Sequence, residues 1–167
     1  KGFMHIEKVY APDIMMNTFK VSAKRGYKHF LYGGKENVAE NLKIKLENEY
    51  PGIQIVGTYC PPFRQLEKNE VIEVSKKIDE SGADIVWCGL GCPKQEKWMA
   101  KFRPLINAPV LIGVGAGFDF LSGEKPLAPD WIKYSGFEWL YRLLSDPKYL
   151  WRRYFKIVPL FIFYLIL

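Results

Sequence analysis

Short apolar runs alternate with amphipathic segments along the first two thirds of the chain. Mostly apolar runs at residues 29–32, 53–56, 84–88 and 109–114 each end near glycine or proline and predict buried strands. The segments between them carry apolar residues at helical spacing and predict helices over residues 13–25, 36–50, 67–81 and 94–103. This alternation predicts an α/β fold, with a Rossmann-like, mostly parallel sheet and helices on both of its faces.

The pattern changes after Gly123. We interpret residues 115–123 as a continuation of the fourth strand, followed by an aromatic helix from about Ala128 that Pro147 breaks. A second helix is predicted over residues 148–156, and residues 157–167 form a tail without charge. We therefore predict a Rossmann-like core at residues 1–123 and a basic, aromatic helical appendage at residues 124–167.

The apolar tail is too short to span a bilayer as a helix, which needs about 20 residues. Aromatic and basic residues leading into an apolar segment are typical of a helix lying in a membrane interface. A helix packed on its own core or on a partner subunit is the alternative, and the pattern leaves it open.

Charge is concentrated near the C-terminus. The chain has a formal net charge of +6, and residues 131–156 hold six basic and two acidic side chains. Such a patch suits anionic lipid, phosphate or nucleic acid, although a merely solvated basic face is the alternative. The chain has three cysteines, an odd number that does not indicate a disulfide framework. Cys88 and Cys92 are four positions apart, which is not the usual spacing of zinc ligands, so we expect no metal. The chain shows no signal peptide, and a reducing cytosolic setting fits best.

Glycine-rich turns follow three predicted strands and carry polar residues. Carboxyl ends of parallel strands, next to helix N-termini, are where open α/β sheets bind phosphates and nucleotides. The predicted substrate-binding residues are Gly33, Gly34, Gly91, Pro93, Lys94, Gln95, Glu96, Gly115 and Asp119. Glycines that only serve tight turns, and an Asp119 that only braces its loop, are the alternatives. Phe118 stands where a dinucleotide fingerprint needs its third glycine, so a nicotinamide-dependent oxidoreductase is the weaker hypothesis.

Taken together, these motifs closely resemble the WecG/TagA/CpsF family, bacterial glycosyltransferases of family 26. The resemblance rests on Gly-Leu-Gly-x-Pro-Lys-Gln-Glu-x-Trp at 89–98 and on Gly-Val-Gly-Ala-x-Phe-Asp at 113–119. It extends to Ala-Pro-x-Trp at 128–131, Gly-x-Glu-Trp-Leu-Tyr-Arg-Leu at 136–143 and Arg-Arg-Tyr at 152–154. It covers essentially the whole chain from Val9.

The resemblance implies inverting transfer of a sugar, N-acetylmannosamine or a related one, from a UDP-sugar to an undecaprenyl-diphosphate-linked acceptor. This reaction belongs to teichoic acid, common antigen or capsule and exopolysaccharide synthesis. It implies no metal or other cofactor, Gln95 and Asp119 in the donor cleft, and Arg142, Arg152 and Arg153 near the lipid diphosphate and membrane. The expected location is the inner face of the bacterial cell membrane, with no nucleic-acid partner and with homo-oligomerisation left open.

Two departures from the family pattern change these expectations. Leu127 stands where family members often carry arginine before Ala-Pro. Lys1 is not a natural start, and the family's general-base aspartate is expected upstream of it, so we expect the catalytic base to lie outside these residues and little transfer from them alone. A non-catalytic nucleotide-sugar-binding or membrane-scaffold fragment is the alternative function.

Overall fold

The computed structural model describes residues 9–166, apart from the side chains of Tyr134, Tyr149, Arg153, Leu165 and Ile166. The chain divides into two compact units, residues 1–125 and residues 126–167.

The first unit is built on a sheet of four parallel strands in the order β2-β1-β3-β4. The strands are β1 (Lys28–Gly33), β2 (Gln54–Tyr59), β3 (Ile85–Gly89) and β4 (Val110–Gly113). All four predicted strands are therefore present, and β2 runs three residues further than predicted. The mostly parallel sheet is confirmed.

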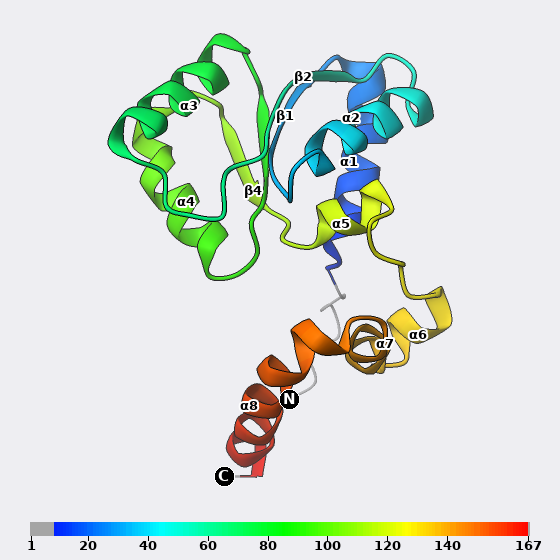
Figure 1. The fold of residues 1–167 in the computed structure, drawn as a ribbon. Helices are drawn as coiled ribbons and strands as arrows, with labels where there is room; N and C mark the ends of the chain where they lie inside the picture. Colours follow the sequence, from blue (N-terminus) through cyan, green and yellow to red (C-terminus); the bar gives the residue numbers. More distant parts are fainter. Residues whose placement is uncertain (1–8, 167) are drawn as a thin grey trace. The chain divides into compact units, whose positions relative to one another are not determined.

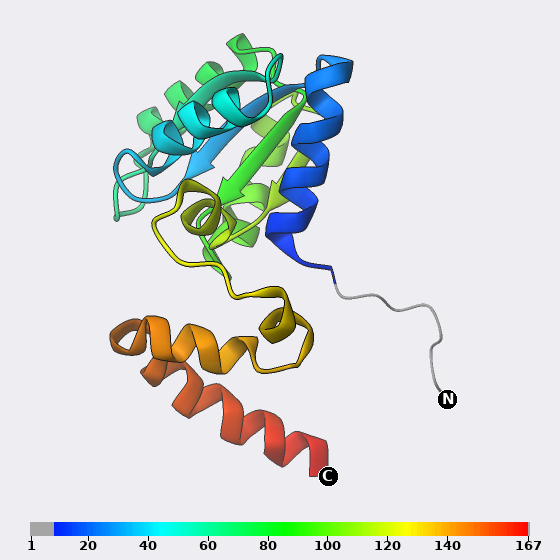
Figure 2. The same ribbon diagram turned by 90° about the vertical axis from the view of Figure 1, so that its right-hand side faces the viewer.

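Helices cover both faces of this sheet (Figures 1 and 2), which confirms the predicted architecture. One face carries α1 (Ala11–Arg25), α2 (Val38–Glu49) and α5 (Gly117–Ser122). The other face carries α3 (Lys68–Glu80) and α4 (Lys94–Phe102), which continues into a short 3-10 turn, η1 (Arg103–Leu105).

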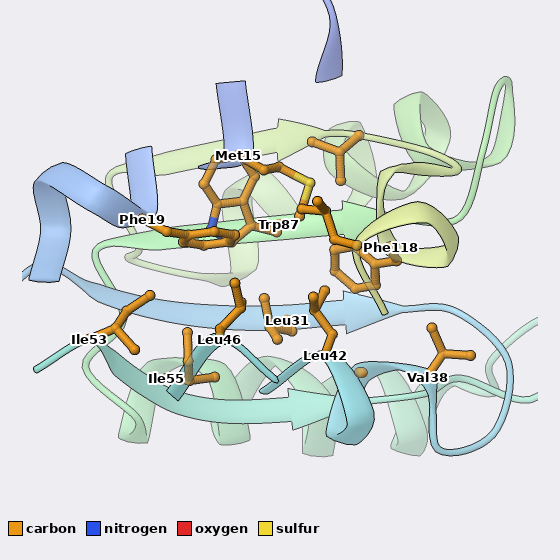
Figure 3. Packing of buried hydrophobic residues seen from close by; sticks show 13 residues of the cluster. Met15, Phe19, Leu31, Val38, Leu42, Leu46, Ile53, Ile55, Trp87 and Phe118 are labelled. Atoms are coloured by element: carbon orange, nitrogen blue, oxygen red, sulfur yellow. The ribbon is translucent and has the colours of Figure 1, made fainter. Parts of the chain in front are cut away.

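Two apolar clusters fill the layers between helices and sheet. On the α1/α2/α5 side, Phe19, Leu31, Trp87 and Phe118 are fully buried (Figure 3). On the α3/α4 side, the Tyr32 ring stacks on Trp98 with 4.2 Å between centroids. The Trp98 ring stacks in turn on Phe102 at 4.4 Å. Burial on both sides explains why the strands read as nearly continuous apolar runs.

The predicted continuation of the fourth strand through residues 115–123 is wrong. Residues 117–122 form α5. Phe118 and Leu121 lie three positions apart, so a helix directs both into the cluster with Phe19 and Trp87, whereas an extended strand would point them to opposite faces. Gly123, with φ of 90°, ends the helix in the left-handed conformation.

Over its described residues, 126–166, the second unit forms three helices rather than the predicted two and a tail. They are α6 (Asp130–Tyr134), α7 (Glu138–Ser145) and α8 (Pro147–Ile166). The single aromatic helix is broken because Gly136 adopts a φ of 82°. Pro147 is the first residue of α8, where its missing N–H costs no helical bond, and α8 continues through Pro159 instead of ending at Lys156. None of the helices in the described residues is long and apolar enough to cross a membrane.

Candidate functional site

The strand order reverses direction between β1 and β3. From β1 the chain passes through α2 to β2 on one side, whereas β3 and β4 follow on the other side of β1. The turns after β1 and β3 therefore lead to helices on opposite faces of the sheet, α2 and α4 (Figure 1). In open α/β sheets, ligands bind outside the carboxyl ends of the strands at such a switch point. The geometry places the candidate site where β1 and β3 end.

The first two predicted glycines lie at this switch point. Gly33 pairs with Gly89 in the parallel register, and the Gly34 N–H donates to the Gly89 carbonyl at 3.2 Å. A Cβ on Gly33 would lie 2.7 Å from the Gly89 backbone, and its φ is 131°. Only glycine fits there, so the turns after β1 and β3 approach each other backbone to backbone.

The turn from β3 into α4 holds most of the other predicted residues. Gly91 has a φ of 76°, and a Cβ placed on it would meet no atom within 4 Å. The bond between Cys92 and Pro93 is cis. Lys94 is the first residue of α4, its side chain is exposed, and it makes no ion pair with the described residues. First-turn N–H groups and an exposed ammonium together suit an anionic group.

The Gln95 side chain links this turn to the one after β4. Its Oε1 accepts the Gly115 N–H at 2.9 Å, and its Nε2 donates to Glu96 Oε1 at 3.1 Å. Glu96 is otherwise exposed. The sequence predicted Gln95 as a group that contacts a hydroxyl or carbonyl, and that role stays a prediction. The structure adds a bond within the protein that uses its carbonyl oxygen.

Asp119 lies in the first turn of α5, and its carboxylate pairs with Lys125. Lys125 Nζ lies 3.4 Å from Asp119 Oδ2, and the Lys125 N–H donates to the Asp119 carbonyl at 2.9 Å. The Asp119 side chain is 24% exposed, so the pair is half-buried and solvent reaches it. Asp119 lies four residues after Gly115, so the turn after β4 and this carboxylate belong to one short segment of the chain.

The predicted arginines belong to the second unit. Arg142 forms an ion pair with Glu138, one turn earlier in α7. Arg152 is exposed on α8, with its guanidinium 5.6 Å from the Trp151 ring centre. The side chain of Arg153 lies outside the described part of the structure. The role of all three arginines at a lipid diphosphate stays a prediction.

A polar cluster at the end of β2 was not predicted. The Thr58 hydroxyl donates to Glu40 of α2, and Lys77 Nζ donates to the Thr58 carbonyl at 3.1 Å. The same ammonium lies 5.6 Å from the centre of the Tyr59 ring. The sequence feature that could have indicated this cluster is Thr58, which follows the apolar run at residues 53–56.

Cys88 lies inside the protein at the switch point and is no nucleophile. Its thiol is fully buried at the end of β3, and burial raises its pKa to about 12. It therefore stays protonated at neutral pH. Within residues 9–166, no three His, Cys, Asp or Glu side chains gather as a metal site would require, and the expectation of metal-free chemistry stays a prediction.

Comparison with known proteins identifies both a family and relatives of this chain. The sequence model of the family described as "Glycosyl transferase WecG/TagA/CpsF family" matches residues 2–167. The chain is also 35% identical over 145 residues to the N-acetylglucosaminyldiphosphoundecaprenol N-acetyl-beta-D-mannosaminyltransferase of Bacillus subtilis (strain 168). That alignment covers 87% of this chain and 54% of the relative, so the chain spans about half of the relative's length.

Proposed function

The chain belongs to the WecG/TagA/CpsF family of glycosyl transferases, and from that premise we propose that its first unit binds the sugar donor of a bacterial cell-surface polymer transferase. The reaction is inverting transfer of N-acetylmannosamine or a related sugar from a UDP-sugar to an undecaprenyl-diphosphate-linked acceptor. The relative's name supports this acceptor chemistry, because that enzyme acts on a diphosphoundecaprenol-linked sugar.

One observation carries the proposal for the donor. The glycine turns after β1 and β3 meet at the topological switch point, and the start of α4 lies directly after one of them. A nucleotide diphosphate fits this place because backbone N–H groups at a helix start attract phosphate oxygens. In our proposal the turns around Gly34 and Gly91 face the diphosphate.

Stabilising the leaving group is the main task of this unit. When the bond from the anomeric carbon to UDP breaks, negative charge develops on the diphosphate. The Lys94 ammonium can supply positive charge there, and the first-turn N–H groups of α4 other than that of Gln95, which donates to Gly91, can supply hydrogen bonds. Asp119, at the next turn, is proposed to accept hydrogen bonds from a ribose or sugar hydroxyl.

Inverting transfer also needs a base that removes the proton of the acceptor hydroxyl. We assign this role to none of the described residues. Asp119 is paired with Lys125, and Glu96 accepts a hydrogen bond from Gln95. By resemblance, the base is an aspartate that precedes the Val9 region in the family.

The second unit is proposed to lie on the anionic inner face of the cell membrane, where the lipid-linked acceptor resides. Trp151 and Phe155 are exposed on α8, and together with Arg152 and Lys156 they line a shallow hollow on the helix surface. Exposed aromatic rings beside basic side chains are typical of helices lying in a membrane interface.

Calorimetric titration tests the donor assignment. UDP and UDP-N-acetylmannosamine are titrated into the chain, with NAD as the comparison ligand. We expect UDP and the UDP-sugar to bind and NAD not to bind. Binding of NAD without binding of UDP would favour an oxidoreductase and contradict the proposal. Binding is measured separately from sugar transfer, so the test does not depend on where the catalytic base lies.

A further inference from the structure

We propose that Gln95 is a positioning residue that holds the two donor-binding turns together through its side-chain amide. The expected effect of Gln95 on donor affinity rests on the proposed function. The link between the two turns rests only on hydrogen bonds within the first unit. The turn after β3 and the turn after β4 are joined through the Gln95 side chain.

Three hydrogen bonds fix Gln95 between the turns. Its backbone N–H donates to the Gly91 carbonyl at 2.9 Å, which ties it to the turn after β3. Its Oε1 accepts the Gly115 N–H at 2.9 Å, which ties it to the turn after β4. Its Nε2 donates to Glu96 Oε1 at 3.1 Å, and this second side-chain bond sets which way the amide plane faces.

The space around the amide is shaped for it. A Cβ on Gly113 would lie 2.8 Å from Gln95 Nε2 and 3.1 Å from the Met99 methyl carbon. Glycine at 113 therefore leaves room for the glutamine amide beside the end of β4. A Cβ on Gly115 would lie 3.6 Å from both Gln95 Oε1 and Gly91 Cα. The backbones of the turn after β3 and the turn after β4 therefore also lie close together.

This bond has a consequence for Asp119. The Gly115 N–H belongs to the turn that leads into α5, and Asp119 follows four residues later. Without an acceptor at position 95, the Gly115 N–H loses its partner and the turn loses this link to α4, while the Val114 N–H still donates to the Cys88 carbonyl at 2.9 Å. Small displacements of substrate-positioning groups lower affinity and rate, so Gln95 acts on the donor through the placement of Asp119 relative to α4.

The test compares two substitutions of equal reach. Gln95→Met removes the acceptor, whereas Gln95→Glu keeps an oxygen for the Gly115 N–H and removes the amide donor. Hydrogen exchange of the Gly115 amide is measured in the ligand-free chain, and UDP affinity is measured by calorimetry. In Gln95→Met we expect Gly115 exchange to accelerate about 10-fold and UDP affinity to fall about 10-fold, the effect of one lost hydrogen bond.

Gln95→Glu separates positioning from substrate contact. We expect it to keep Gly115 protection and to bind UDP within about 3-fold of the unsubstituted chain, a difference smaller than one hydrogen bond. The new carboxylate can also weaken UDP binding by repelling the diphosphate. Titrations at low and high salt distinguish this repulsion from loss of the bond to the Gly115 N–H, because salt screens only the repulsion. Gln95→Asn, one methylene shorter, replaces Gln95→Met if that variant does not fold.

Two results would overturn the inference. One is unchanged Gly115 exchange in Gln95→Met, and the other is a Gln95→Glu chain that keeps Gly115 protected yet binds UDP as weakly as Gln95→Met at both salt concentrations. If the unsubstituted chain fails to bind UDP at all, the proposed function fails, and the Gly115 exchange rates still decide whether Gln95 joins the turns.

Discussion

The indole N–H of Trp87 donates a hydrogen bond to Nδ1 of His29, with 3.0 Å between the two nitrogens. Both side chains are fully buried between the sheet and α1, and the Phe19 ring packs edge-on against His29 at 5.1 Å. An Nδ1 that accepts a hydrogen bond carries no proton, so His29 is neutral with its proton on Nε2. Burial lowers the pKa of His29 to about 4.

This histidine makes the free energy of unfolding depend on pH. Unfolded His29 binds a proton near pH 6.5 and folded His29 only near pH 4, so stability is complete above pH 6.5 and falls between pH 6.5 and 4. The loss amounts to about 3 kcal/mol at the acid end of that window. Urea unfolding at a series of pH values measures it.

His29→Asn is the matched control, because its Oδ1 still accepts from the Trp87 N–H but does not titrate. We expect a less stable chain whose stability changes much less between pH 6.5 and 5, above the range in which carboxylates titrate. An equal slope in both chains would show that His29 is not the titrating group.

Gly33 is the position at which the close approach of two turns requires glycine. We expect Gly33→Ala to lower the free energy of unfolding by about 3 kcal/mol or more, since it combines a positive φ with a clash against backbone. Gly91→Ala is the control: φ is also positive there, but the space is open, and about 1 kcal/mol is expected. Equal costs in denaturant unfolding would contradict the close approach.

Most helices and strands of the first unit were predictable from the sequence, because the apolar patterns that mark them are local. Val38, Leu42 and Leu46 mark the buried face of α2, and the apolar run around Val86 marks a strand covered on both sides. The order β2-β1-β3-β4 was not predicted, because local pattern does not say which strands pair.

The errors have physical reasons. Phe118-Asp-Phe120 alternates like a strand, yet Phe118 and Leu121 bury together only as a helix. The second helix of the appendage was predicted to end at Lys156, but α8 continues past Pro159 with apolar residues on both sides. The bond from Gly115 to Gln95 joins residues 20 positions apart, and sequence spacing carries no signal for it.

Lys94 is expected to contribute directly to UDP affinity. Lys94→Ala should weaken UDP binding about 10-fold, because a charge-assisted contact to a phosphate is lost. Lys76→Ala is a suitable control, since Lys76 is an exposed lysine of α3 that pairs with Glu80. A Kd that changes equally in both variants would show that only net charge matters.

The membrane role of the second unit predicts a loss of lipid binding on truncation. Leu160, Phe161 and Phe163 are more than half exposed on α8. Removing residues 157–167 should weaken sedimentation with anionic liposomes, because the apolar part of the helix is lost. Unchanged liposome binding would reject this role.

The charged part of α8 makes a separate prediction. Arg152→Glu combined with Lys156→Glu should reduce binding to anionic liposomes more than binding to neutral ones, by about 1 kcal/mol or more for each lost basic residue. Equal reductions on both lipids would show that the basic residues do not recognise lipid charge.

The most direct test of the donor site is a titration of the isotope-labelled chain with UDP, followed through its backbone amide signals. We predict that the largest shifts fall on Gly34, Gly91, Lys94 and Gly115, at the carboxyl edge of β1, β3 and β4. Saturable shifts confined to other surfaces, such as the outer face of α2 around Ile44, would contradict the account, as would no shifts at all.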